Sequence, residues 1–468
     1  MCGLIGGYGE PSDAGLAALA HRGPDAHAIV RLGRAWLGHT RLAILDLDPR
    51  SDQPFRRGPL TLVYNGEAWN YVEVREELRA LGEVFVTSGD TEVVAAALLR
   101  WGPEAALLRL DWMGALAWVV DGEDVLRLAR DRFGEVPLHV SAALPFRFAS
   151  ELKALLAAGC VPRSFVDVGP GELWEVSERR IERRTRWYDP PVVPDLGATR
   201  AGAQVEVRAL IHEGSVRRSI SDAPACALLS GGIDSAAIVH ALASVMPDLV
   251  TYVAVMDPGS RDLRCARVTA EALGLRLVEV PIPPPTADDL AATVRIIELP
   301  LKAQVEVAWP CVVLADRIRA DGFRVTFAGE GSDELWASYG FSDYALLTGD
   351  WYAYRHDLVL SQARKNFPRA NKAFLSRGVE CRLPFLHPPL VERALSLPRH
   401  VVQNFHGAPS QHRKAIMSEA YRGVLPDEVV DRRKTPFQVG LGQDAHIARV
   451  LPDPRRFYAA EYRGTFGG

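Results

Sequence analysis

The stretch that decides the fold is Ala225-Cys-Ala-Leu-Leu-Ser-Gly-Gly-Ile-Asp-Ser-Ala-Ala-Ile-Val-His240. Its first five residues are an apolar run typical of a buried strand, and residues 236–246 form an apolar helical stretch. Between them lies Ser230-Gly-Gly-Ile-Asp-Ser235. Two glycines let backbone N–H groups turn inward, hydroxyls flank them, and a helix N-terminus faces the same point. The stretch therefore predicts a loop that binds phosphate.

The residues after this loop alternate between strand-like and helix-like runs. This spacing is typical of a parallel, doubly wound sheet. The loop itself matches neither the Walker A spacing nor the dinucleotide fingerprint. We expect strands at 225–229, 250–255, 276–280 and 324–327, and helices at 236–246, 265–273 and 307–320.

The residues before the loop have a different pattern, with many short strands and few helices. This pattern favours antiparallel sheets covered by helices. We expect strands at 4–8, 36–45, 60–64, 84–87, 114–120, 125–129 and 146–149, and helices around 71–81, 90–101 and 151–157. Three prolines in Asp189–Gly197 predict an extended connector. We therefore expect two domains, residues 1–190 and 200–468.

Composition excludes several classes of protein. The 468 residues carry 54 Lys and Arg against 58 Asp and Glu, a net charge of −4, which argues against a nucleic-acid or membrane-surface platform. No apolar run approaches the roughly 20 residues that cross a bilayer, and the N-terminus lacks a secretory pattern. Six cysteines are scattered singly, which favours a reducing cytoplasm. We expect no nucleic-acid or membrane partner.

Cys2 has the chemistry of an N-terminal nucleophile. Removal of Met1 would leave a thiol and an α-amine on one residue. Their unperturbed pKa values, about 8.5 and about 7.7–8.0, are close enough for the amine to accept the thiol proton near neutral pH.

The blocks that follow Cys2 resemble the glutaminase domain of class II glutamine amidotransferases, in the asparagine synthetase branch. They are His21-Arg-Gly-Pro-Asp25, Leu37–Asp46, Tyr64-Asn-Gly-Glu67 (taken as a strand ending in a turn), Ser88–Glu92, Ala129–Gly134 and Phe148–Ala154. The resemblance implies an αββα Ntn-hydrolase sandwich. It also implies that Cys2 attacks the glutamine carboxamide, that Asn65 and the Gly66 N–H form the oxyanion hole, and that Arg41, Glu67 and Asp90 bind glutamine. His21 and His39 are expected to be structural.

The second half resembles the ATP pyrophosphatase domain of asparagine synthetases, an adenine nucleotide α-hydrolase-like fold. The matching segments are the 230–235 loop, Phe327–Glu334, Arg369–Ala373 and Gly378–Leu386. The resemblance implies that Asp234 and Asp333 bind Mg²⁺, that Ser230, Gly231, Gly232 and Ser235 hold pyrophosphate, and that Val255 and Gly329 line the adenine slot. Lys414, with the 432–436 segment, would face phosphate, and Glu330 would take a proton from ammonia. Glu380 and Arg382 are either active-site groups or a buried pair.

The implied reaction joins the two halves. Glutamine is hydrolysed at Cys2, ATP adenylates a carboxylate with release of pyrophosphate, and ammonia displaces AMP to form an amide. The acceptor is either aspartate or another carboxylic acid of specialised metabolism, because Trp309, Trp336 and His387 depart from the family pattern. The alternatives are a cyclase resembling β-lactam synthetase and a glutaminase-fold protein with a regulatory second half. The oligomeric state stays open, with a homodimer as one arrangement.

Overall fold

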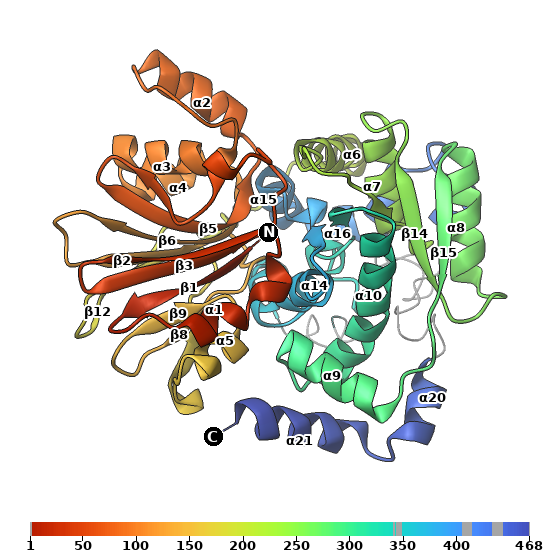
Figure 1. Ribbon diagram of the computed structural model, residues 1–468. Helices are drawn as coiled ribbons and strands as arrows, with labels where there is room; N and C mark the ends of the chain where they lie inside the picture. Colours follow the sequence, from red (N-terminus) through yellow and green to blue (C-terminus); the bar gives the residue numbers. More distant parts are fainter. Residues whose placement is uncertain (1, 340–341, 343–348, 405–413, 433–442, 468) are drawn as a thin grey trace.

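The computed structural model describes residues 2–339, 342, 349–404, 414–432 and 443–467, and it divides into two halves that lie side by side (Figure 1). In the N-terminal half, two six-stranded antiparallel sheets have the strand orders β10-β8-β9-β1-β3-β2 and β12-β11-β7-β6-β5-β4. The strands are β1 (Gly3–Tyr8), β2 (Ala26–Leu32), β3 (Ala35–Arg41), β4 (Phe55–Arg57), β5 (Leu60–Ala68), β6 (Trp112–Val120), β7 (Leu126–Arg130), β8 (His139–Ser141), β9 (Arg147–Ala149), β10 (Phe165–Asp167), β11 (Glu172–Val176) and β12 (Ile181–Arg186).

Helices cover the outer face of each sheet. One apolar cluster, with Leu4, Leu37 and Val63, fills the space between the sheets. A second lies under α2 (Tyr71–Ala80), α3 (Asp90–Trp101) and α4 (Pro103–Arg109), and a third lies under α1 (Asp13–Ala17) and α5 (Leu152–Ala157). Because both faces of the sheets are covered, the central strands β1, β3, β5 and β6 are almost wholly buried. This confirms the predicted sandwich of antiparallel sheets.

The C-terminal half contains the predicted parallel sheet. Strands β13 (Ala227–Leu228), β14 (Val250–Val255) and β15 (Arg276–Pro281) pair in parallel, as do β16 (Val325–Phe327) and β17 (Glu380–Arg382). A parallel bridge between Ala225 and Val325 joins the two groups. The helices are α6 (Arg200–Arg217), α7 (Ile233–Ala243), α8 (Arg261–Ala272), α9 (Ala287–Ile297), α10 (Lys302–Ala320), α11 (Ser332–Leu335), α13 (Trp351–Ser361), α14 (Asn366–Leu375), α15 (Pro388–Ser396), α16 (Arg399–Val402), α17 (Ala415–Ala420), α18 (Asp427–Val430), α20 (Gln443–Val450) and α21 (Pro454–Phe466). Among the helices described, none is long and apolar enough to span a bilayer.

Two local predictions in the N-terminal half were wrong. Residues 84–87 form no strand, because the Glu92 carboxylate accepts the N–H groups of Val86 and Thr87 and holds them in an irregular turn. Residues 64–67 form no turn, because β5 continues to Ala68 in register with β6. Glycine is needed at position 66 because β5 and β6 approach closely there. A Cβ on Gly66 would lie 2.1 Å from the Met113 carbonyl oxygen.

Buried charges join the two halves. Glu298, at the end of α9, accepts the backbone N–H groups of Leu152 and Lys153 at the start of α5, each at 2.9 Å. The same carboxylate accepts the Lys372 ammonium of α14 at 2.6 Å. Burial alone would raise the pKa of Glu298, but Lys372 and Lys153 hold it below its ordinary value. A residue of one half thus caps a helix of the other.

We expect Glu298→Ala to lower the free energy of unfolding by about 3–5 kcal/mol, because it leaves the Lys372 ammonium buried without this partner. Urea denaturation measures the change. Glu178→Ala, which breaks an exposed pair with Arg34, is the matched control and should cost less than about 1 kcal/mol. Equal losses in the two variants would contradict this account of the contact.

Candidate functional site

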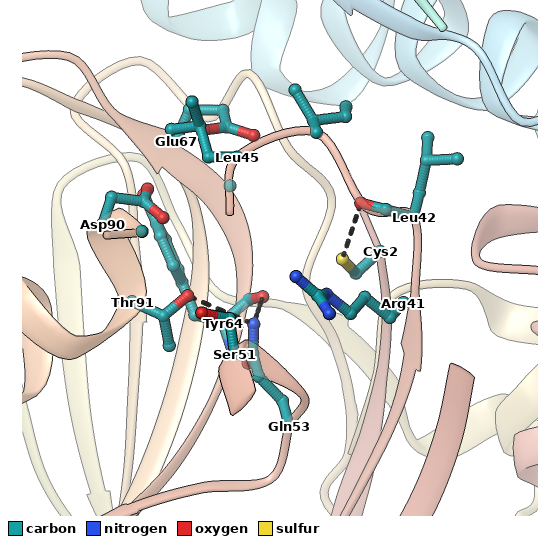
Figure 2. Close-up of a pocket in the computed structure, with 13 residues that line it drawn as sticks. Cys2, Arg41, Leu42, Leu45, Ser51, Gln53, Tyr64, Glu67, Asp90 and Thr91 are labelled. Atoms are coloured by element: carbon teal, nitrogen blue, oxygen red, sulfur yellow. Dashed lines mark hydrogen bonds between the residues drawn. The ribbon is translucent and has the colours of Figure 1, made fainter. Parts of the chain in front are cut away.

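The thiol of Cys2 lies in a pocket of the N-terminal half, next to the start of β1 (Figure 2). Its backbone N–H donates to Asn65 Oδ1 at 2.7 Å, and its Sγ lies 3.9 Å from the Leu42 carbonyl oxygen. Burial raises the pKa of the Cys2 thiol above its ordinary value. The resting thiol is therefore protonated near neutral pH, and a base beside it is needed before it can attack.

The structure brings most of the predicted glutamine-site residues around this pocket. Figure 2 shows the Arg41 guanidinium beside Cys2 and the Glu67 and Asp90 carboxylates on another side. Asn65 accepts the Cys2 backbone N–H, and its Nδ2 lies 3.5 Å from Ser150 Oγ. The pocket is lined by Cys2, Arg41, Leu42, Ile44, Leu45, Ser51, Gln53, Tyr64, Gly66, Glu67, Gly89, Asp90 and Thr91.

The Arg41 guanidinium is a positively charged group that lines the pocket and is held in place by several hydrogen bonds. It is 6% exposed at the end of β3, where its Nη1 donates to the Asp48 carbonyl at 3.0 Å and to Asp52 Oδ1 at 2.6 Å. Its Nη2 donates to the Asp46 carbonyl. These bonds fix the plane of a fork whose geometry matches a carboxylate.

Glu67 and Asp90 are buried acids whose charged forms a bound cation would stabilise. Burial raises the pKa of Asp90 to about 6, and it raises that of Glu67 well above its ordinary value, with further increases from the nearby Glu380. Asp90 accepts the Ala68 N–H at 2.8 Å, whereas Glu67 Oε2 has no hydrogen-bond partner among the described residues. A bound ammonium group would pair with both acids. Together with Arg41, the pocket therefore suits the two charged ends of an amino acid.

The 230–235 loop in the C-terminal half is preorganised. Gly231 has φ +74°, and a Cβ there would lie 2.0 Å from the Asp262 carbonyl oxygen, so only glycine fits. Ser235 Oγ accepts the Ser230 N–H at 3.1 Å and lies 3.1 Å from Ser230 Oγ. Gly232 is the N-cap of the eleven-residue helix α7. The positive end of this helix therefore faces the loop, as predicted.

Two acids from distant segments meet beside the loop. Asp234 Oδ2 and Asp333 Oδ1 each lie 2.5 Å from Lys414 Nζ, and Ser332 Oγ donates to Asp234 Oδ1 at 2.7 Å. Burial by itself would lower the pKa of Lys414, but the two carboxylates raise it above its ordinary value. Oxygens of both carboxylates therefore contact the same cation, the Lys414 ammonium. Mg²⁺ is commonly held by one or two carboxylates together with phosphates, so this donor set fits it. The described residues contain no cluster of three or more His, Cys, Asp or Glu that could hold a metal.

Of the other predicted nucleotide residues, Gly329 lies next to the acidic pair. A Cβ on Gly329 would lie 3.1 Å from Asp234 Cβ, and Val255 ends β14 half-buried. Glu330 accepts a hydrogen bond from Arg369 of α14. Arg432 Nη1 donates to the Gly231 carbonyl at 2.6 Å, and the rest of the predicted 432–436 segment lies outside the described residues.

Glu380 and Arg382 form a buried pair, which was one of the two alternatives. Arg382 Nε donates to Glu380 Oε1 at 2.7 Å, and its Nη1 donates to the carbonyls of Arg218 and Ile220 at 2.5 and 2.7 Å. The pair lies close enough to the glutamine pocket for Glu380 to raise the pKa of Glu67.

Sequence analysis gave no role to two buried groups near the sites, Glu334 and Arg22. Glu334 accepts hydrogen bonds from Tyr339 Oη at 2.6 Å and Asn366 Nδ2 at 2.9 Å, and burial, with the adjacent Asp333, raises its pKa to about 7. Arg22 donates to the Cys2 carbonyl at 2.8 Å. The consecutive acids at 333–334 could have signalled Glu334, whereas the contact of Arg22 with Cys2 depends on the tertiary fold.

The residues that depart from the family pattern lie in different surroundings. Trp336 is fully buried in the hydrophobic core. His387 packs against Gly214 and Arg218, with Asp111 of the N-terminal half 3.8 Å away. Trp309 Nε1 donates to the Pro283 carbonyl at 3.2 Å. Trp336 and His387 are therefore packing groups of the core and of the contact between the halves.

Comparison with known proteins finds a family match for each half of the chain. A family model described as a glutamine amidotransferase domain matches residues 1–170, and one described as asparagine synthase matches residues 206–371 and 360–454. The second match spans more than half of the chain, which therefore belongs to the asparagine synthase family. This membership confirms the predicted class, an ATP-dependent ligase that hydrolyses glutamine and forms amides.

Individual relatives are similar over nearly the whole chain. Asparagine synthetase B [glutamine-hydrolyzing] of Escherichia coli (strain K12) is 29% identical over 473 residues, covering 94% of this chain and 83% of that protein. Asparagine synthetase [glutamine-hydrolyzing] 3 of Arabidopsis thaliana is 27% identical, covering 91% of this chain and 75% of that protein.

A solved glutamine phosphoribosylpyrophosphate amidotransferase from B. subtilis is 20% identical and covers 60% of this chain and 66% of that chain. Its TM-score of 0.36 is too low to support an inference.

The pKa of Asp90 sets an expected pH profile. A carboxyl group is uncharged below its pKa, so Asp90 should lose its attraction for the ammonium group of glutamine below about pH 6. We expect kcat/KM for glutamine hydrolysis to fall by up to about tenfold for each pH unit below that value. Glutamate release measured between pH 5 and 8 gives the profile. Asp90→Asn should be weak at every pH and lack this limb, and a flat wild-type profile from pH 5 to 7 would contradict the assignment.

Proposed function

We propose that this chain makes an amide by releasing ammonia from glutamine at Cys2 and transferring it to a carboxylate adenylated in the C-terminal half. The observation that carries the proposal is the Cys2 pocket, which has the Arg41 guanidinium beside Cys2 and the Glu67 and Asp90 carboxylates on another side. Arg41 would bind the carboxylate of an amino acid, and the two acids would bind its ammonium group. Such a pocket binds free glutamine, and Cys2 is the nucleophile within it.

Hydrolysis of glutamine uses groups already near Cys2. After loss of Met1, the Cys2 amine, hydrogen-bonded to Asn65, accepts the thiol proton and the sulfur attacks the carboxamide carbon. The Gly66 N–H and the Asn65 amide stabilise the developing oxyanion, and comparable donors contribute about 2.7–4 kcal/mol each. Ammonia leaves, and water then releases glutamate from the thioester.

Activation of the acceptor uses the 230–235 loop and the acidic pair. Ser230, Gly231, Gly232 and Ser235 bind the phosphates through backbone N–H groups and hydroxyls. Asp234 and Asp333 would hold Mg²⁺, which neutralises phosphate charge when it is bound. The acceptor carboxylate displaces pyrophosphate from ATP, and Lys414 stabilises the negative charge on this leaving group.

The second step of synthesis takes place beside Glu330. Ammonia attacks the acyl carbon, Glu330 accepts a proton from the attacking nitrogen, and AMP leaves with one oxygen of the original carboxylate. The hydrogen bond from Arg369 holds the Glu330 carboxylate in one orientation for this proton transfer. Val255 and Gly329 would contact the adenine.

The acceptor is aspartate or another carboxylic acid of specialised metabolism. The similarity to glutamine-hydrolysing asparagine synthetases supports aspartate. We assign residues 1–190 to glutamine hydrolysis and 200–468 to synthesis, with a homodimer as the assembly to test. Six free thiols fit a reducing cytoplasm.

Cys2→Ala should separate the two activities. We expect glutamine-dependent amide formation to fall by at least about 1,000-fold, because the nucleophile is gone, while activity with added ammonium salt stays within about twofold. Amide product is measured with either nitrogen source. Cys160→Ala, a free thiol elsewhere in the same half, is the control and should keep both activities. Equal loss of both activities in Cys2→Ala would refute separate sites.

Asp333→Asn should stop adenylation while sparing glutamine hydrolysis. Loss of one carboxylate charge weakens the cation site shared with Asp234, so we expect at least about a 100-fold loss of ATP–pyrophosphate exchange. Exchange is assayed with aspartate and a panel of other carboxylic acids. Asp316→Asn changes an exposed acid paired with Arg377 and should behave as wild type. Undiminished exchange in Asp333→Asn would show that this carboxylate does not hold the metal.

A further inference from the structure

Arg22 connects the Cys2 backbone to the C-terminal half. Its side chain is fully buried, and three of its nitrogens donate to three different segments. Nε donates to the Cys2 carbonyl at 2.8 Å, Nη1 to Glu151 Oε1 at 2.6 Å, and Nη2 to Asn371 Oδ1 at 2.9 Å. A planar guanidinium held at three corners has one orientation. The position of the Cys2 carbonyl therefore depends on the other two acceptors, Glu151 and Asn371.

Asn371 belongs to α14, a helix that several buried bonds hold rigidly in the C-terminal half. Asn366 bonds to Glu334, Arg369 to Glu330, and Lys372 to Glu298. All four polar side chains of this helix are at most 9% exposed. Figure 1 shows α14 facing the N-terminal half. The helix can therefore act as a fixed support for Arg22.

The kind of residue at position 371 is itself informative. Asparagine in a helix interior is less favourable than alanine, and a buried amide needs hydrogen-bond partners. The bond from Arg22 supplies Asn371 with one such partner. The other acceptor, Glu151, is shared with Lys153 at 2.7 Å and with His21 at 3.0 Å. These two partners bind Oε2, so Oε1 holds Arg22 within the N-terminal half, and Asn371 supplies the acceptor in the C-terminal half.

We propose that Asn371, a residue of the synthetase half, is a positioning residue for glutamine hydrolysis at Cys2. The inference rests on the proposed function of Cys2. Asn371 does not touch glutamine: it fixes Arg22, and Arg22 fixes the main chain that carries the nucleophile. A misplacement of about 1 Å in a reacting group can cost roughly 100-fold in rate. The glutaminase site is thus complete only when the synthetase half is folded against it.

The test compares Asn371→Leu with Asn371→Asp in the full chain. Leucine removes the acceptor, and we expect kcat for glutamate release to fall by about 10–100-fold with KM for glutamine within about twofold. Aspartate keeps an oxygen that faces Arg22, and we expect it to retain kcat within about threefold. Amide formation from added ammonium salt should stay within about twofold in both. Ser376→Ala, at the C-cap of the same helix, is the control and should match wild type.

Three results would overturn the proposal. In the first, Asn371→Leu keeps the wild-type kcat. In the second, Asn371→Asp loses as much as Asn371→Leu, so the Arg22 acceptor is not what matters. In the third, glutamate release, ammonia-dependent synthesis and the melting temperature fall together, as a structural role alone would require. These results differ from a failure of the proposed function itself, in which the wild-type protein would release no glutamate.

Discussion

The proposed nucleophile, Cys2, is held by groups that lie far from it in the sequence, and the arrangement of the molecule follows from this constraint. Its N–H bonds to Asn65 of β5, its thiol lies against the Leu42 carbonyl after β3, and its carbonyl bonds to Arg22. Arg22 in turn bonds to Asn371 in the other half. The two antiparallel sheets and the contact between the halves must all be formed before the thiol has a fixed position.

Each of the two sites is complementary to a ligand of particular charge. Burial raises the pKa values of Glu67 and Asp90, so the glutamine pocket is most stable with an ammonium group beside these acids. In the C-terminal half, the Lys414 ammonium already lies between Asp234 and Asp333. Mg²⁺ held by these acids would share their oxygens with Lys414 and would neutralise phosphate charge.

Local sequence patterns correctly predicted the elements whose conformation depends on neighbouring residues in the chain. The strand at 250–255 coincides with β14, and the glycine turn after β13 has the positive φ that a phosphate loop needs. Pairing between strands that are distant in the sequence was harder to predict. The run 60–64 continues to Ala68 because β6 pairs with it, and 84–87 follows the carboxylate of Glu92 instead of pairing.

The site was predictable in its residue types and less so in its supporting contacts. Arg41, Gly66, Glu67 and Asp90 surround Cys2 as expected. The bonds from Arg22 to Asn371 and from Lys372 to Glu298 join residues separated by 349 and 74 positions, and no spacing rule signals them. His387, a departure from the family pattern, packs against Gly214 and Arg218, with Asp111 of the other half 3.8 Å away, and no local pattern predicts these contacts.

The central claim is that a carboxyl group is activated by adenylation and then receives the nitrogen of glutamine. An acceptor acid labelled with ¹⁸O in its carboxylate, starting with aspartate, tests it most directly when turned over with glutamine and ATP. The account requires one labelled oxygen per molecule in the AMP that is formed, with unlabelled pyrophosphate. Label in orthophosphate, with ADP as the nucleotide product, would contradict it.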